Sequence, residues 1–124
     1  MNIGEIYVWA TRKAKGHDER KKYHVFICES DWQDGNIFLF ISSIDYGGDL
    51  KIAGYDFLPN DASFVSCTAV VDYSDDELNN VYEPSYVGGL TNKDLARLFD
   101  AVARSDIMEG RHIRRVCSAL AKFK

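Results

Sequence analysis

Residues 23–44, YHVFICESDWQDGNIFLFISSI, contain two strand candidates on either side of a turn. Residues 23–28 alternate in the manner of a strand with two differently packed faces. Its side chains form two sets, Val25 with Ile27 and Phe26 with Cys28. Residues 37–44 begin apolar on both faces, which is typical of a central strand. The turn residues around Gly35 therefore join two strands at the centre of a sheet.

Strand candidates continue on both sides of this centre. They are residues 5–11, which are β-branched and aromatic, residues 63–73, and residues 50–57, whose strand pattern is weaker. The longest of them, 63–73, could bend near Ala69. The charged stretch 12–22 and the Pro- and Gly-containing stretch 74–90 are interpreted as loops. The first two thirds of the chain thus predict five or six strands.

The last third of the chain changes to helical periodicity. Thr91 is suited to cap a helix N-terminus, and Asp94 is placed to cap it reciprocally. Apolar residues then recur at helical spacing in two segments that Gly110 separates. They are Leu95, Leu98, Phe99 and Val102, then Ile113, Val116, Cys117, Leu120 and Phe123. Strands followed by helices predict an α+β fold: a small antiparallel, barrel-like sheet with one or two C-terminal helices, as one domain over residues 1–124.

Charge is distributed unevenly along the 124 residues, whose formal net charge is −4. Residues 1–24 carry six Lys and Arg against three Asp and Glu. Residues 25–90 carry one Lys against twelve Asp and Glu, and residues 91–124 carry eight Lys and Arg against four acids. Two basic ends therefore flank an acidic middle. Such sorting allows a charged partner to bind one region even though the total is negative.

Several functional classes are excluded. The histidines are His17, His24 and His112, and the cysteines are Cys28, Cys67 and Cys117. The histidines are too scattered for a metal set, and His24 and His112 are expected at element boundaries. No P-loop, dinucleotide, zinc-protease or serine-hydrolase motif occurs, so we expect no metal and no cofactor. Cysteines without C-x-x-C spacing indicate reduced thiols and a cytoplasmic protein, and no apolar run is long enough to span a membrane.

A basic segment precedes the central strands. It holds Lys13, Lys15, Arg20, Lys21 and Lys22 within ten residues. A cationic loop binds phosphates without sequence preference. The second central strand ends in Ser42 and Ser43, so a cation at one strand start and a hydroxyl at the neighbouring strand end could converge on one phosphate. The other interpretation, that these charges keep an exposed hairpin loop soluble, remains open.

The order of these parts resembles the MazF/PemK family of toxin ribonucleases. Gly4-Glu5-Ile6 is similar to the family's opening Gly-Asp-Ile, and Ile41-Ser42-Ser43 is similar to its hydrophobic-Thr-Ser strand end. Residues 22–27 stand where the family has Arg-Pro and an aliphatic run. The remaining similar segments are Ser63-Phe64-Val65-Ser66-Cys67, like the Ser-x-Val strand, and Gly89-Leu90, like the start of the family's helix. The resemblance runs from residue 4 to about residue 107.

The resemblance implies an SH3-like barrel that forms a homodimer, cuts single-stranded RNA without metal and is restrained by a cognate antitoxin. The family's catalytic Arg falls on Lys22 and its hydroxyl on Ser42, or Arg20 supplies the cation through a shift in register. The further residues implied to contact RNA are Lys13, Lys15, Lys21, Tyr23 and His24, the last two by stacking on a base or bonding to it. Lys22 lacks the bidentate fork of Arg, and the family's Pro is absent.

A second hypothesis is a catalytically inactive member of the same fold that binds a protein or a nucleic acid. The acidic middle suits a basic protein partner. The basic helix over residues 111–124 could bind an acidic partner or nucleic acid, or its cations could simply face water over a buried apolar stripe. A third hypothesis is that two subunits associate through Trp9, Trp32 or residues 82–87, although such aromatics are often core residues.

Overall fold

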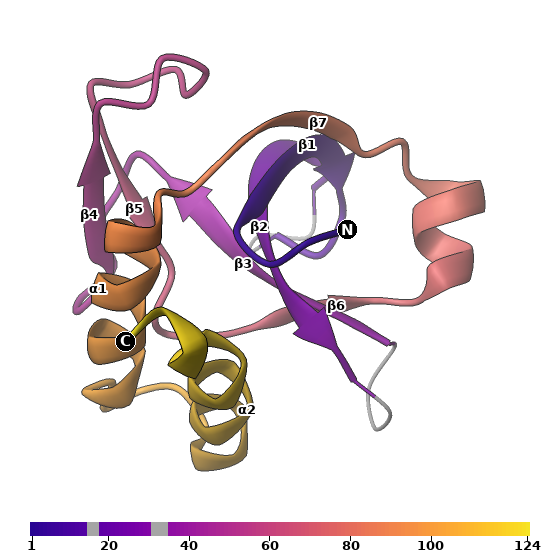
Figure 1. Ribbon diagram of the computed structural model, residues 1–124. Coiled ribbons are helices and arrows are strands. Elements are labelled where there is room, and N and C mark those ends of the chain that lie inside the picture. The colour runs from indigo at the N-terminus through magenta and orange to yellow at the C-terminus, as the bar shows by residue number, and fades with distance from the viewer. Residues whose placement is uncertain (15–17, 31–34) are drawn as a thin grey trace.

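A curled seven-stranded antiparallel sheet forms a half-barrel, with helices from the C-terminal third packed on it (Figure 1). This computed structural model describes residues 1–14, 18–30 and 35–124. The strands are β1 Glu5–Thr11, β2 Arg20–Glu29, β3 Asn36–Ser42, β4 Leu50–Ala53, β5 Ala62–Val65, β6 Val71–Tyr73 and β7 Ser85–Gly89. The helices are α1 Asn92–Ala103 and α2 Gly110–Leu120, with short turns η1 Glu77–Val81 and η2 Ala121–Phe123. The predicted small α+β, SH3-like barrel is confirmed.

The sheet has the strand order β4-β5-β3-β2-β1-β7, and β6 also pairs with β3. At the end of β3, Ile41 and Ser42 pair with β5, whereas the start of β3 pairs with β6. Residues 66–70 lie between these two pairings, and there the Ser66 N–H donates to the Phe40 carbonyl oxygen over 2.9 Å. The single strand predicted over 63–73, with a bend near Ala69, is therefore two strands, β5 and β6, with residues 66–70 between them.

The two faces of the sheet are packed in different ways. One face forms an aliphatic core with α1 and α2, in which residues such as Val25, Ile27 and Leu98 are almost fully buried. The other face forms an aromatic core, whose buried members are Trp9, Phe26, Phe38, Val71 and Tyr73. Cys28 packs against the aliphatic core and not beside Phe26 as predicted, because the β2–β3 register shifts between these two residues.

The N-terminus of α1 is capped as predicted, but with a different second partner. The Thr91 hydroxyl oxygen accepts the Asp94 N–H over 3.1 Å. The Asp94 carboxylate does not reach back. It accepts instead from the Tyr55 hydroxyl (2.5 Å), whose oxygen accepts the Thr91 N–H (3.1 Å). Tyr55 thus replaces the reciprocal acid and ties α1 to the segment after β4.

Three predicted boundaries are corrected. Residues 74–90 are not all loop, because η1 lies there and β7 pairs with β1. β2 begins at Arg20, so the basic residues after that point belong to a strand. The strand expected over 50–57 ends at Ala53. Lys15, His17 and Trp32 lie outside the described residues. In the described part of the chain no helix is long and apolar enough to cross a membrane.

Candidate functional site

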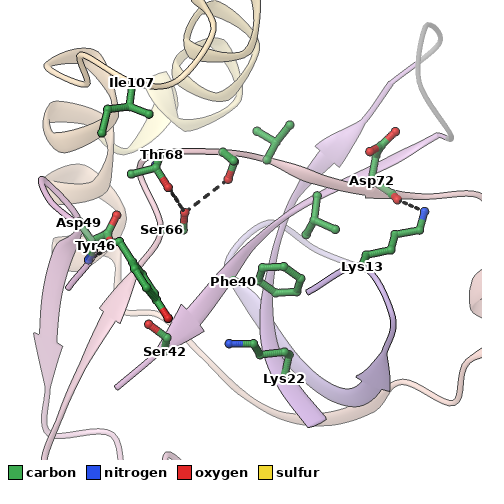
Figure 2. A pocket seen from close by; sticks show the side chains of 13 residues that line it. Lys13, Lys22, Phe40, Ser42, Tyr46, Asp49, Ser66, Thr68, Asp72 and Ile107 are labelled. Carbon is green, nitrogen blue, oxygen red and sulfur yellow. Dashed lines mark hydrogen bonds between the residues drawn. The ribbon is translucent and has the colours of Figure 1, made fainter. Parts of the chain in front are cut away.

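A groove of about 630 Å³ lies where the chain leaves the edge of β3 between β5 and β6 (Figure 2). We call it the central groove, and its walls include Lys13, Lys22, Phe40, Ser42, Tyr46, Asp49, Ser66, Thr68, Ala69, Val70, Asp72 and Ile107. The groove exists because residues 66–70 make no continuous strand pairing with β3. The break in the sheet therefore opens the floor of the site.

Lys22 and Ser42 both face this groove, as the sequence predicts for a shared site. They lie on adjacent antiparallel strands, each one residue beyond the paired Tyr23 and Ile41. Figure 2 shows the Lys22 ammonium pointing toward Ser42. Lys22 Nζ lies 5.7 Å from the centre of the Phe40 ring, and among the described residues it has no ion-pair partner. A cation and a hydroxyl thus converge at one open position.

The Ser42 hydroxyl is already engaged in a local turn. Its O–H donates to the Ile44 carbonyl oxygen over 2.7 Å, and its oxygen accepts the Ile44 N–H over 3.3 Å. The hydroxyl can accept one further hydrogen bond, but it can donate to a ligand only after releasing Ile44. In this arrangement Ser42 supports binding more directly than proton transfer.

A second pocket, of about 280 Å³, adjoins the central groove on the side of the β2 start. We call it the basic pocket. Its cations are Arg20, Lys21 and Lys22, and it shares Lys22, Ser42 and Tyr46 with the central groove. None of the described residues lining it is Asp or Glu. The acidic middle of the sequence therefore contributes uncharged walls to this pocket and, among the described lining residues, no carboxylate, which suits an anion such as phosphate.

Tyr46 is a site residue that the sequence analysis missed. Its side chain is 58% exposed, and it lines both the central groove and the basic pocket. Its backbone N–H donates to Asp49 Oδ2 over 2.9 Å, and Asp45 Oδ1 accepts the Gly47 N–H over 2.8 Å. The sequence DYGGD signals this turn, but a turn alone does not show that its aromatic ring faces a groove.

Lys13 has a structural role within the described fold. Its Nζ donates to the Asp72 carbonyl oxygen (2.5 Å) and to Glu77 Oε1 (3.1 Å), and it lies 4.5 Å from the centre of the Tyr73 ring. These contacts join the end of β1 to β6 and η1. Lys13, which the resemblance implies as an RNA contact, lines the central groove, but its ammonium is held by the protein.

His24 lies inside the molecule, so the expectation of a boundary position is wrong. Its side chain is 0% exposed, stacked on Trp9 with ring centroids 3.5 Å apart. A ring buried in this way has no face open to an RNA base. Tyr23, by contrast, is half-buried and lines the basic pocket while packing against the aliphatic core.

Hydrogen bonds fix the protonation of His24. Nδ1 lies 3.0 Å from the Lys22 carbonyl oxygen, which can only accept, so Nδ1 carries the proton. Nε2 therefore accepts from the Tyr73 hydroxyl (2.9 Å), and Tyr73 in turn accepts from Thr11 (2.7 Å). Burial lowers the pKa of His24 to about 3 and raises that of Tyr73, so both side chains are neutral. This network fixes the Lys22 backbone from within the core.

Some of the remaining candidates are engaged within the described fold. Trp9 is 4% exposed and belongs to the aromatic core, so it is not open to a second subunit. On α2, Arg111 pairs with Glu109 over 2.8 Å, and Arg115 donates to the Glu29 carbonyl oxygen. Within residues 1–14, 18–30 and 35–124, no group of three or more His, Cys, Asp or Glu could hold a metal ion.

Comparison with protein-family models and with curated proteins finds no match for this chain. The assignment of function therefore depends on the chemistry of the central groove and the basic pocket. In the basic pocket the charged lining residues are cations only, and the central groove beside it adds hydroxyls, two aspartates and an exposed aromatic ring. This combination suits a ligand that carries both phosphate and an aromatic base.

Proposed function

We propose that the protein is a metal-independent endoribonuclease that binds single-stranded RNA across the basic pocket and the central groove. The observation that carries this proposal is the basic pocket, where Arg20, Lys21 and Lys22 gather without a carboxylate among the described lining residues. In a chain of net charge −4, such a concentration favours a polyanion. Tyr46 adds a surface on which a base can stack.

The reaction proposed is attack by the ribose 2′-hydroxyl on the adjacent phosphorus. The 2′ oxygen bonds to phosphorus, the bond to the 5′ oxygen breaks, and the 2′-hydroxyl proton ends on that 5′ oxygen. A cyclic phosphate and a 5′-hydroxyl result, and no co-reactant is consumed. Lys22 and Arg20 would stabilise the extra negative charge on the phosphorane, and Ser42 would bond to a phosphate oxygen.

A homodimer and a cognate antitoxin belong to the same proposal. An acidic segment of an antitoxin would complement the basic pocket and exclude RNA from it. Mixing the protein with such a partner is then expected to suppress cleavage and RNA binding together.

The direct test is incubation of the purified protein with RNA of mixed sequence in the presence of a chelator, with mapping of the cut ends. Cleavage should persist in the chelator. Lys22→Ala should lower the rate by about 100-fold or more, the size found when one transition-state contact is removed. Lys22→Arg should retain activity, since Arg keeps the charge.

The matched control is Lys93→Ala, because Lys93 is an exposed lysine on α1. Absence of cleavage by the wild type, or equal rates for Lys22→Ala and Lys93→Ala, would contradict the proposal.

A second candidate function is RNA binding without cleavage. The observation that favours it is the Ser42 hydroxyl, whose proton is donated to the Ile44 carbonyl oxygen. In that case RNA would bind in a Lys22-dependent manner and remain intact over hours. A gel-shift measurement alongside the cleavage assay separates the two functions.

A further inference from the structure

We propose that the central groove binds a nucleobase next to the phosphate held in the basic pocket, and that Tyr46 is the side chain on which this base stacks. The inference rests on the proposed binding of RNA and adds to it the location of base recognition. Its starting point is a division of charge between two adjoining spaces. The basic pocket carries cations without acids, whereas the central groove has two lysines and two aspartates in its walls.

Two of the four charged side chains that line the central groove, Lys13 and Asp49, are engaged by the protein itself. Lys13 is held by Asp72 and Glu77, as described above. Asp49 accepts backbone N–H groups through both carboxylate oxygens, from Tyr46 to Oδ2 and from Cys67 to Oδ1, each over 2.9 Å. Apart from Asp72 and the Lys22 that it shares with the basic pocket, the groove offers a ligand aromatic, aliphatic and hydroxyl surface. That surface suits an uncharged planar group better than a second phosphate.

The walls provide both stacking and hydrogen bonding. Phe40 and Val70 supply apolar surface, and Ser66 and Thr68, on the segment that leads to Val70, place two hydroxyl oxygens 3.2 Å apart (Figure 2). The Ser66 hydroxyl already donates locally, to Thr68 or to the Ala69 carbonyl oxygen (3.5 Å), and it accepts the Thr68 N–H (3.4 Å). The Thr68 hydroxyl is therefore the group with both donor and acceptor capacity for the edge of a base. A volume of about 630 Å³ is ample for one base with its ribose.

Tyr46 is placed and braced as a stacking platform. It is exposed, and it is not among the residues that pack in either core. Its loop is held by Asp45 and Asp49, so the backbone under the ring is fixed. In Figure 2 the ring reaches into the groove with its hydroxyl directed toward Ser42. A base stacked on Tyr46 would thus be attached to the phosphate beside Lys22.

The occupant could instead be an apolar side chain of a peptide, because Ile107 at the rim is also 64% exposed. The observations favour RNA. Lys22 and Ser42 line both the central groove and the basic pocket, and the charged residues in the described lining of the basic pocket are all cations. A ligand that spans both must carry an anion beside its planar part. A nucleotide within a strand meets this requirement, whereas an apolar peptide does not.

The test is a double-mutant cycle between the protein and the RNA. Fluorescence anisotropy measures the binding of a short 2′-O-methylated RNA, which cannot be cut, and of copies that each lack one base. The proteins are the wild type, Tyr46→Ala, Tyr46→Phe and Tyr86→Ala. Tyr86 is the matched control, because it is 60% exposed and lies on β7 outside the groove.

Tyr46→Ala should weaken binding about tenfold, the typical effect of removing one base-stacking side chain, while Tyr46→Phe and Tyr86→Ala should bind like the wild type. Removal of one particular base should weaken the wild type by a similar factor. The same removal should have no further effect on Tyr46→Ala, because the contact is already absent.

Two results would overturn the inference without touching the proposed function. One is RNA binding that needs Lys22 but is equal in Tyr46→Ala and Tyr86→Ala. The other is a Tyr46→Ala defect that adds in full to the loss of every base, which would mean that Tyr46 contacts no base. Failure of the wild type to bind RNA at all would overturn the proposed function and this inference together.

Discussion

The aliphatic core and the aromatic core, on opposite faces of one sheet, are built on different physical principles. In the aliphatic core, branched side chains from the strands pack against α1 and α2, and burial alone favours the arrangement. In the aromatic core, Trp9, Phe38 and Tyr73 meet edge to face, with ring centroids 5.0 to 5.7 Å apart. This second core also encloses a directional chain of hydrogen bonds through Thr11, Tyr73 and His24.

The difference shows which part of the molecule holds the candidate site. The aliphatic core fixes the helices, and of its residues Tyr23, Ile41 and Leu58 contribute walls of the basic pocket beside Lys22. The aromatic core lies directly beneath the site, because His24 bonds to the Lys22 carbonyl and Tyr73 underlies Lys13. Non-directional packing sets the fold, whereas directional bonds set the backbone positions from which the site side chains extend. The following predictions separate these two contributions.

The largest change in the free energy of unfolding is expected from a cavity in the aliphatic core. Leu98 on α1 is fully buried, so Leu98→Ala should lower the free energy of unfolding by about 3 kcal/mol. Leu98→Met, which conserves volume, should cost less than about 1.5 kcal/mol. Denaturant unfolding at neutral pH measures both. Equal losses for the two variants would show that this core, too, depends on a specific geometry.

Acid should destabilise the protein through the aromatic core. The unfolded chain takes up a proton on His24 near the ordinary histidine pKa of about 6.5, whereas burial lowers the folded pKa to about 3. The contribution of the neutral His24 to the free energy of unfolding is therefore complete above pH 6.5 and is lost as the pH falls toward 3. Between pH 7 and pH 5 the free energy of unfolding should drop by about 2 kcal/mol through His24 alone.

The control for the acid effect is a variant that cannot take up this proton. His24→Gln should be less stable at pH 7, but its stability should change less between pH 7 and pH 5 than that of the wild type. The measurement is urea unfolding of both proteins at several pH values in this window, above the main titration range of the carboxylates. The same slope in both proteins would mean that His24 is accessible to protons in the folded state.

Much of the fold could be predicted from local patterns. β2 follows from alternating apolar residues, β1 from β-branched and aromatic residues, and β3 from a run that is apolar on both faces. α1 follows from its cap and its helical spacing. β7 could not be found, because its Gly88-Gly89 pair is typical of a turn. A glycine is required at position 88 by a contact with a distant segment, because a Cβ there would lie 2.3 Å from the Phe57 ring. Contacts of this kind between distant segments leave no local signal.

The candidate site was predictable only in part, for the same reason. The convergence of Lys22 and Ser42 follows from antiparallel strands joined by a turn, which is a local feature. The burial of His24 depends on β6 and Tyr73, 49 residues further along the chain. The exposure of Tyr46 toward a groove depends on the break in pairing at residues 66–70. The spacing of residues along the chain gives neither the distance nor the direction between such segments.

The smallest of the three effects tests whether the hydrogen bonds of the aromatic core act as one unit. Tyr73→Phe keeps the ring but removes the hydroxyl that joins Thr11 to His24, leaving Nε2 without its donor. The free energy of unfolding should fall by about 1.5 kcal/mol, the cost of one unsatisfied buried acceptor. Tyr82→Phe, in the same aromatic cluster, should change the free energy of unfolding by less than about 0.5 kcal/mol.

The coupling between the two hydroxyls is tested by the double variant Thr11→Val with Tyr73→Phe. Its loss of unfolding free energy should be smaller than the sum of the single losses, because the bond between the two hydroxyls can be lost only once. Strict additivity would mean that the two hydroxyls act independently, and the contrast between a directional and a non-directional core would then rest on His24 alone.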